Sequence, residues 1–403
     1  KEFYAVWNEE AGCWSTDLDD VIRMIDKLMD EYKRKDPDLE NAKILYMKYS
    51  SSGSIDQWWK FIKKQVSDNY HPLDEKLTFL NDPPNKLNYS SKHLNYSLEK
   101  GPHEAWDELV GTLYSPEEKH KIEWAIGSII CGDSKWIQKF LVFYGDSGTG
   151  KSTVLNIIQE LFDGYYITFD VKAIGNGNKD FALEPFKKNP LIAIQHDGDL
   201  SRIEDNTRLN SLVSHEEMNV NEKFKSQYSM RFSTMLFMGT NRPVKITYSK
   251  SGVIRRLIDV SPTGKKIPNR RYNQLNKNVK FELGAIAEHC LEVYEADPHY
   301  YDEYIPKTMI GATNVFYNFM EEYFDEFSKA EGITLNDAWF KYQLYCSEAK
   351  VPYPYTKMIF KEELKNYFQV YKERYHPADG ENLRNWYSGL KLEKFGIEDG
   401  SIR

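Results

Sequence analysis

Residues 145–152, GDSGTGKS, match the pattern G-x-x-x-x-G-K-[ST], whose chemistry is phosphate binding. Backbone N–H groups of such a glycine-rich loop face a phosphate, and the following helix adds the partial positive charge of its N-terminus. The lysine reaches the β- and γ-phosphates, and the hydroxyl after it holds Mg²⁺. The sequence therefore predicts a nucleoside triphosphate site with Mg²⁺, formed by Gly145, Asp146, Ser147, Gly148, Thr149, Gly150, Lys151, Ser152 and Thr153.

The second candidate group of reactive residues is the acidic pair Asp197 and Asp199, which follows the apolar run 191–194. A P-loop enzyme needs a carboxylate at the end of a neighbouring strand to hold Mg²⁺ and polarise the attacking water. Alternation along a strand that continues through Gly198 would place both carboxylates on one face. Two other interpretations stay open: a two-metal polymerase or primase site of the D-x-D type, and a turn with solvated aspartates. The P-loop upstream favours the first interpretation, with Asp197 as the Mg²⁺ ligand.

Two further polar groups occur downstream. Asn241 follows the apolar run 235–238, and its amide can hydrogen-bond the attacking water or the γ-phosphate, although T-N-R-P is also ordinary turn chemistry. Arg255 and Arg256 lie between apolar residues and need an anionic partner. An arginine that stabilises the γ-phosphate contributes a factor of about 10³ to 10⁵ in rate. We expect one arginine to act in this way and the other to form a structural ion pair.

The segment 216–232, EEMNVNEKFKSQYSMRF, alternates apolar and polar residues on both of its arms. This pattern predicts a β-hairpin with a basic, polar tip that contains Lys223 and Lys225. On an isolated surface hairpin these lysines would only add solubility. In a ring they would point into the pore and follow a phosphate backbone.

The sequence around these groups predicts the strands and helices of an α/β core, which would position them. The apolar run 141–143 forms a strand before the loop, and apolar residues at helical spacing follow it from Val154 to Leu161. Ser115, Pro116 and Glu118 are typical of a helix start, because they combine a cap, a first-turn proline and a capping-box glutamate. We therefore predict a P-loop ATPase domain over residues 111–278.

The flanking regions are predicted to be mostly helical. Residues 1–110 form an N-terminal helical domain and linker, with helices expected at 17–32 and 54–66 and a loop-rich tract at 81–104. Residues 279–403 form a C-terminal helical, winged-helix-like region. Its expected elements are helices at 281–296, at 334–349 with a cap at Thr334, and at 357–368, followed by short aromatic segments at 381–396.

Composition limits the partners. The 403 residues suffice for about two or three domains, and a net charge of −8 gives no global basic field, so any nucleic-acid site must be a local patch. The four cysteines are far apart, which argues against zinc and a disulfide framework and favours reduced thiols in a cytoplasmic protein. No apolar run reaches the length of a membrane span. Because the chain begins with Lys1, we expect a fragment of a longer protein.

The order of these motifs, from the P-loop through the acidic strand, basic hairpin and Asn strand to the arginines, resembles a superfamily 3 helicase. This is the compact AAA+ type of viruses, phages and mobile elements, and the chain is most similar to phage and poxvirus helicase-primase C-terminal modules. The resemblance covers residues 115–265. It implies an ATP-dependent DNA helicase of phage or mobile-element replication that moves along single-stranded DNA, in the host cytoplasm if phage-encoded. It also implies a ring, usually a hexamer, with ATP hydrolysed between subunits.

The resemblance assigns roles residue by residue. The P-loop residues would bind ATP and Mg²⁺, and Lys223 and Lys225 would contact single-stranded DNA. Asp197 and Asp199 would be the acidic pair, Asn241 the polar sensor, and Arg255 or Arg256 the arginine that reaches ATP on the adjacent subunit. The family usually carries Glu in the acidic strand, so the carboxylate that activates water is left open. A primase or polymerase domain before Lys1, or separate replication proteins, would be further partners.

Other functions compete with the helicase. A DNA-packaging ATPase, or a nucleotide-gated DNA-loading factor that does not translocate, would use the same motifs. The acidic net charge keeps the loading factor open as an alternative. A P-loop small-molecule kinase would predict an arginine-rich lid and a monomer, and it would leave the hairpin and the Asn strand unexplained.

Overall fold

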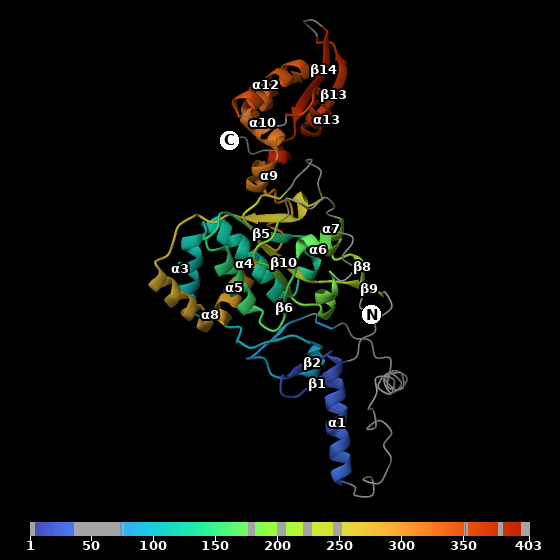
Figure 1. Cartoon of the computed structure of the whole chain (residues 1–403), viewed down its shortest axis with the longest axis vertical. Coiled ribbons are helices and arrows are strands. Elements are labelled where there is room, and N and C mark those ends of the chain that lie inside the picture. The colour runs from blue at the N-terminus through green and yellow to red at the C-terminus, as the bar shows by residue number, and fades with distance from the viewer. Residues whose placement is uncertain are drawn as a thin grey trace. The chain divides into compact units, whose positions relative to one another are not determined.

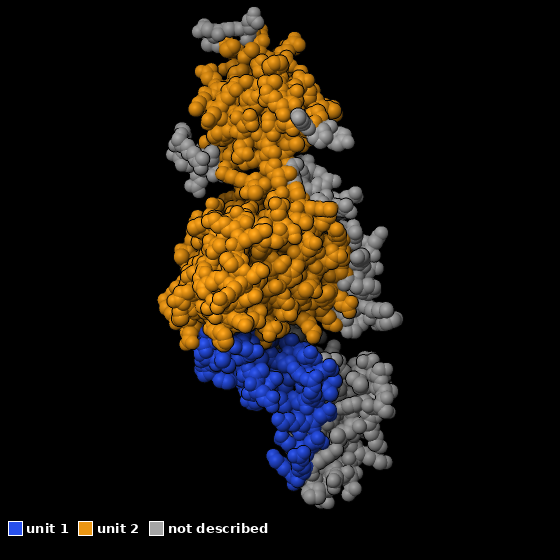
Figure 2. All heavy atoms as spheres, turned by 60° about the vertical axis from the view of Figure 1, so that its left-hand side comes forward, with its two compact units in different colours: residues 1–98 blue, residues 99–403 orange. Residues whose placement is uncertain are grey.

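The computed structural model describes residues 5–35, 73–74, 76–175, 182–199, 207–220, 228–244, 252–349, 351, 354–377 and 382–395. The chain divides into two compact units, Lys1–Leu98 and Glu99–Arg403 (Figure 2). This division comes earlier than the boundary predicted after residue 110, because the helix α3 (Glu104–Leu113) belongs to the second unit. No helix in the described part of the chain is long and apolar enough to cross a membrane.

The first unit contains the predicted amphipathic helix, α1, over Leu18–Lys35. The helix expected at 54–66 lies outside the described residues. The tract 81–104 is more ordered than a linker, since Lys92 is buried and forms an ion pair with Asp74 at 3.3 Å. The short strands of this unit are β1 (Val6–Asn8), β2 (Cys13–Ser15), β3 (Thr78–Phe79) and β4 (His93–Leu94).

A five-stranded parallel sheet forms the centre of the second unit, in the order β11-β5-β10-β7-β6 (Figure 1). The central strands are almost entirely buried, as expected for a parallel sheet that is covered on both faces. Because all strands run in one direction, their carboxyl ends meet at one edge. The strands are β5 (Phe140–Tyr144), β6 (Tyr166–Thr168), β7 (Ile192–Gln195), β10 (Met235–Thr240) and β11 (Leu257–Val260).

Helices α3, α4 (Pro116–Cys131) and α8 (Asn269–Ala296) pack together, with α3 and α4 both against α8 (Figure 1). The helix start predicted at Ser115 is confirmed, since its hydroxyl accepts the Glu118 N–H at 3.3 Å. Helix α8 begins well before the expected residue 281, so the boundary predicted at 278 falls inside a continuous helix. The other helices are α5 (Lys151–Leu161), α6 (Val171–Gly175) and α7 (Thr207–Val213).

Gly127 sets how closely α4 approaches α8. A Cβ at this position would lie 2.0 Å from the Cys290 carbonyl oxygen and 2.7 Å from the Tyr294 Cβ, so any side chain would push the two helices apart. We expect Gly127→Ala to lower the free energy of unfolding by about 1–3 kcal/mol, the usual cost of overpacking. Urea unfolding measures this change in the free energy of unfolding. The matched control is Gly111→Ala on α3, where no atom lies within 4 Å and alanine should stabilise the helix. Equal effects of the two substitutions would contradict this account.

The predicted hairpin is confirmed in its two arms. Strands β8 (Glu217–Val220) and β9 (Tyr228–Arg231) pair antiparallel. The tip lies outside the described residues, and with it Lys223 and Lys225. The role of these two lysines therefore stays a prediction from the sequence.

The C-terminal region ends in a three-stranded antiparallel sheet of order β12-β14-β13. The cap predicted at Thr334 is confirmed, because its hydroxyl accepts the Asp337 N–H at 3.2 Å. The aromatic segment expected near the end of the chain forms one strand of this sheet. The elements are α9 (Lys307–Thr313), α10 (Val315–Glu322), α11 (Phe324–Lys329), β12 (Ile333–Thr334), α12 (Leu335–Glu348), α13 (Lys357–Tyr367), β13 (Phe368–Tyr375) and β14 (Leu383–Leu390).

Candidate functional site

A cleft of about 540 Å³ lies where β5, β7 and β10 end. This is the edge of a parallel sheet at which ligands usually bind, and the volume is that of a small-molecule site. The cleft brings together three of the predicted groups, because the P-loop, Asp197 and Asn241 all line it. Its lining residues are Leu113, Ser147, Gly148, Gly150, Lys151, Ser152, Thr153, His196, Asp197, Asn241, Lys265, Lys266, Ile267, Asn269 and Tyr272.

The conformation of the loop 145–150 requires glycine at several positions. Gly148 and Gly150 have φ of 76° and 95°, in the left-handed region that side chains disfavour. A Cβ on Gly150 would also lie 2.7 Å from a methyl carbon of Leu113, and one on Gly145 would lie 2.7 Å from the Pro262 ring. Helix α5 begins directly after the loop, so its free N–H groups face the cleft. The loop therefore fits an anionic ligand such as a triphosphate.

Lys151, the first residue of α5, is folded over the loop. Its Nζ donates to the carbonyl oxygens of Gly145 and Asp146, at 2.6 and 2.7 Å. Burial lowers the pKa of Lys151, and the carboxylates of Asp197 and Asp146 partly oppose that shift. Because phosphate oxygens are charged, they are stronger acceptors than these two neutral carbonyls. The ammonium is thus placed to exchange the loop carbonyls for a phosphate.

The two acidic residues do not share one face. Asp197 is exposed and lines the cleft, whereas Asp199 is not among the described lining residues. The Asp199 carboxylate pairs with Arg242 at 3.2 Å and with Lys172 at 3.4 Å. Strand β7 ends at Gln195, so the alternation expected through Gly198 does not occur. The carboxylate available to a metal ion in the cleft is therefore Asp197 alone of the pair.

Asn241 lies between the other two groups in the cleft. It follows β10, which pairs with β5 on one side and β7 on the other, so its amide lies between the P-loop and the acidic strand. The turn chemistry considered from the sequence is also present, since the Thr240 hydroxyl accepts the Arg242 N–H at 3.0 Å. The turn thus presents the Asn241 side chain, which is exposed, to the cleft.

Arg255 and Arg256 lie at the amino ends of the strands, opposite the carboxyl ends where the cleft is. They directly precede β11, whose first residue Leu257 pairs in parallel with Phe140, the first residue of β5. The P-loop begins at Gly145, about 16 Å further along β5 at the usual rise per residue. Neither arginine is among the described residues that line the cleft. Both arginines therefore lie at the amino ends of the strands, away from the P-loop of the same chain.

The two arginines differ in their surroundings. Arg256 is buried and donates to the Ser214 hydroxyl at 2.7 Å and the Gly252 carbonyl at 2.8 Å, so its partners in the described part of the chain are neutral groups rather than the expected carboxylate. Arg255 has an exposed side chain, and its carbonyl accepts a 2.8 Å hydrogen bond from Lys139. Burial lowers the pKa of Lys139 to about 8. Arg255 is thus the arginine available to a neighbouring molecule.

One wall of the cleft contains no sequence motif. The segment after β11 and the first turn of α8 provide Lys265, Lys266, Ile267, Asn269 and Tyr272. The Tyr272 hydroxyl lies 3.0 Å from that of Thr153 in the P-loop helix. These residues match no known motif. Their place in the chain, after the last strand of the sheet, is the one feature that could have assigned them to the cleft. A segment that follows the last strand of a parallel sheet starts at the carboxyl edge, where the ligand binds.

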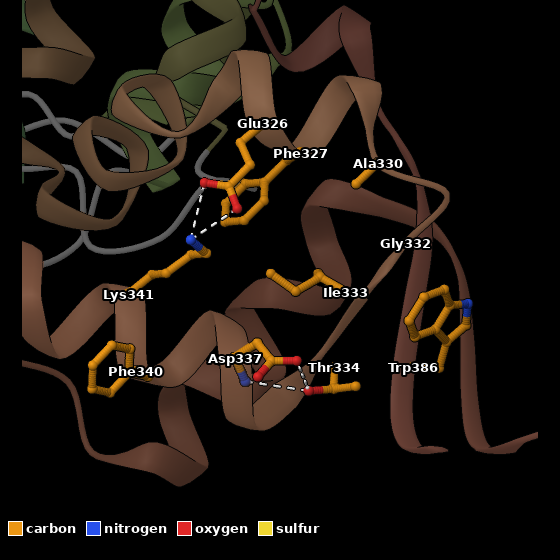
Figure 3. A pocket seen from close by; sticks show the side chains of 10 residues that line it. All are labelled: Glu326, Phe327, Ala330, Gly332, Ile333, Thr334, Asp337, Phe340, Lys341 and Trp386. Atoms are coloured by element: carbon orange, nitrogen blue, oxygen red, sulfur yellow. Dashed lines mark hydrogen bonds and ion pairs between the residues drawn. The ribbon is translucent and has the colours of Figure 1, made fainter. Parts of the chain in front are cut away.

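A second cavity, of about 420 Å³, lies in the C-terminal region (Figure 3). Its polar side chains are already paired with one another: Glu326 with Lys341 at 2.8 Å, and Thr334 with Asp337 at 2.7 Å. Trp386 lines its far side. These pairs make the cavity a structural feature of the region rather than a reactive site.

One family model matches part of the chain, and several solved structures are similar to it. A family of unknown function (DUF5906) matches residues 143–256, which run from β5 to the arginine pair. No curated protein matches the chain significantly. Among solved structures, "The apo structure of NrS-1 C terminal region (305-718)" is similar at 15% identity with a TM-score of 0.46, over 84% of this chain and 90% of that one. An A form apo structure of the same region gives 14% and 0.46, over 84% and 91%.

Proposed function

We propose that the chain is an ATPase that acts on single-stranded DNA, as a superfamily 3 type helicase of phage or mobile-element replication. The observation that carries this proposal is the cleft where β5, β7 and β10 end, which brings Lys151, Asp197 and Asn241 together around a glycine loop. A P-loop, a carboxylate and a polar side chain are the groups that hydrolysis of a triphosphate needs.

The roles of the cleft residues follow from their chemistry. The loop N–H groups and Lys151 bind the phosphates, and Lys151 neutralises charge that develops on the β- and γ-phosphates. Ser152 and Asp197 would hold Mg²⁺, which when bound draws charge from the phosphate oxygens. Asn241 orients the water that attacks the γ-phosphate. Tyr272 and Ile267 also line the cleft and are the apolar and aromatic side chains that could contact the base and ribose of the nucleotide.

The position of Arg255 supports a shared site. The arginine lies at the sheet edge opposite its own cleft, so it would complete the cleft of a neighbouring subunit. Repeated head-to-tail contacts of this kind form a ring when the rotation between subunits closes. In such a ring the hairpin tip, with Lys223 and Lys225, would face the DNA. The C-terminal order of helix, strand, two helices and two strands supports a winged-helix-like module there.

A DNA-loading ATPase without translocation is the second candidate, and the net charge of −8 is compatible with it. The discriminating measurements are the ATPase rate with and without single-stranded DNA, the solution mass, and strand separation. We expect DNA to increase the rate several-fold, a mass that is a multiple of 47.3 kDa, and separation of a forked duplex. Stimulation without strand separation would favour the loading factor. A monomer that is indifferent to DNA would contradict both functions and favour the small-molecule kinase.

A further inference from the structure

Lys139 is a buried lysine that none of the roles assigned so far uses. It directly precedes β5, and its Nζ donates to the carbonyl oxygen of Arg255 at 2.8 Å. It forms no ion pair with the residues that the structure describes, and the charges of Asp302 and Glu303 only partly oppose the effect of burial on its pKa. Burying an ammonium without a paired carboxylate costs free energy. Stability alone therefore does not account for a lysine at this position.

The bond from Lys139 acts on the main chain of Arg255. Arg255 lies in a single 3-10 turn, Ile254–Arg256, directly before β11. Its guanidinium is exposed and makes no hydrogen bond or ion pair with the described part of the chain. The direction in which this side chain leaves the protein is therefore set by the main chain that carries it, and the Lys139 ammonium holds that main chain directly.

Both partners of this bond are tied to the same short turn, Ser214–His215. On the lysine side, Nε2 of the buried His215 lies 2.9 Å from the carbonyl oxygen of Ile137, two residues before Lys139. On the arginine side, the Ser214 hydroxyl accepts the Nε–H of Arg256 at 2.7 Å. The lysine thus extends from a fixed segment to a fixed turn, which makes its contact a preorganised one.

We propose that Lys139 is a positioning residue of the shared site: it holds the main chain of Arg255 so that the guanidinium is presented to the cleft of the neighbouring subunit. This proposal rests on the proposed function, in which Arg255 completes that cleft. A displacement of about 1 Å in a group that acts on the reacting phosphate costs up to about 10²-fold in rate. Lys139 itself touches no nucleotide, because it lies at the amino end of β5 and is not among the described residues that line the cleft.

The test begins with Lys139→Met, which keeps the length of the side chain and removes the donor. We expect kcat for ATP hydrolysis to fall by about 10- to 100-fold and KM to stay unchanged, because the chain's own cleft is intact. Urea unfolding should show equal or greater stability, since a buried charge is removed. The matched control is Lys391→Met, which removes another lysine that donates to a carbonyl, that of Asn366 at 3.3 Å in the C-terminal region, and should leave kcat unchanged.

Mixing of chains separates positioning from a general structural role. Lys139→Met keeps its cleft, whereas Lys151→Ala keeps both Lys139 and Arg255. In a head-to-tail ring formed at equal amounts, about a quarter of the interfaces join an intact cleft to a correctly held arginine. The rate should therefore rise to about a quarter of that of the original chain. Lys139→Met mixed with Arg255→Ala forms no such interface and should give only the mean of the two separate rates.

The mixture of Arg255→Ala with Lys151→Ala distinguishes failure of this proposal from failure of the proposed function. If that mixture recovers activity and the mixture of Lys139→Met with Lys151→Ala does not, the positioning role is overturned and the shared site is kept. If neither mixture recovers, both are overturned. An unchanged kcat in Lys139→Met would also overturn the positioning role. Lys139→Gln is the second variant if the methionine chain does not fold, and failure of both to fold would assign the lysine to stability instead.

Discussion

Lys151→Ala is expected to abolish ATP hydrolysis while the chain remains folded. Lys151 is the cation that lies over the loop, and among the described residues its Nζ donates to the carbonyls of Gly145 and Asp146. Loss of one preorganised donor to the developing charge typically costs a factor of about 10² to 10³ in rate. Phosphate release at saturating ATP and Mg²⁺ measures this effect. Asp146 is exposed and Gly145 is half-buried, so water can satisfy their carbonyls and the free energy of unfolding should change little.

The control for this substitution is Lys172→Ala. Lys172 is also a lysine near the carboxyl edge of the sheet, but it pairs with Asp199 at 3.4 Å and is not among the described residues that line the cleft. Its loss should leave the rate within a few-fold of the original. Retained turnover in Lys151→Ala, or an equal loss in Lys172→Ala, would refute the assignment of the cleft as the site of hydrolysis.

The parts of the site that the sequence predicted correctly depend on near neighbours in the chain. A strand, a glycine loop and a helix follow one another within residues 140–161, and the side-chain caps at Ser115 and Thr334 bond a residue three positions further on. The arms of the hairpin β8–β9 are likewise defined by local alternation. In each case the interactions that decide the structure are visible in a short window of sequence.

The pairing of Asp197 with Asp199 could not be predicted in the same way. Strand β7 stops before these residues, and Gly198 instead donates to the Gly239 carbonyl at 2.7 Å and packs against Met238. These contacts come from β10, which is distant in sequence. Arg242, the partner of Asp199, follows the same strand. The separation of the two carboxylates therefore depends on strand order, which local periodicity does not contain.

The start of helix α8 and the cleft wall at residues 265–272 were not predicted from the sequence, for a related reason. The first turns of α8 are polar, and only Leu275 and Val279 are buried before residue 280. Tertiary contacts support their helical form, since Arg271 donates to Glu108 of α3 at 2.6 Å and the Tyr272 hydroxyl lies 3.0 Å from that of Thr153 in α5. A helix that is stabilised by tertiary contacts rather than by its own apolar stripe gives a weak periodic signal. The residues 265–272 could therefore be assigned to the cleft only from the structure.

Arg255→Ala is expected to lower the ATPase rate by about 10³ to 10⁵ while nucleotide binding is preserved, because the missing guanidinium would act only on charge that develops during transfer. Arg256→Ala should instead reduce stability, since its buried guanidinium bonds Ser214 and Gly252. Nucleotide titration and urea unfolding distinguish the two outcomes. A stability loss in Arg255→Ala with a normal rate would show that the exposed arginine has been assigned the wrong role.

Whether Arg255 acts on a neighbouring subunit is decided by mixing two inactive chains. Arg255→Ala keeps Lys151 and its cleft, whereas Lys151→Ala keeps the arginine. In a head-to-tail ring mixed at equal amounts, about a quarter of the interfaces would join an intact cleft to an intact arginine. Activity should therefore reappear on mixing and should peak near equal proportions. Because Arg255 lies at the sheet edge opposite its own P-loop, an arginine acting within one chain would require a different fold of β11, and it would give no rescue at any ratio.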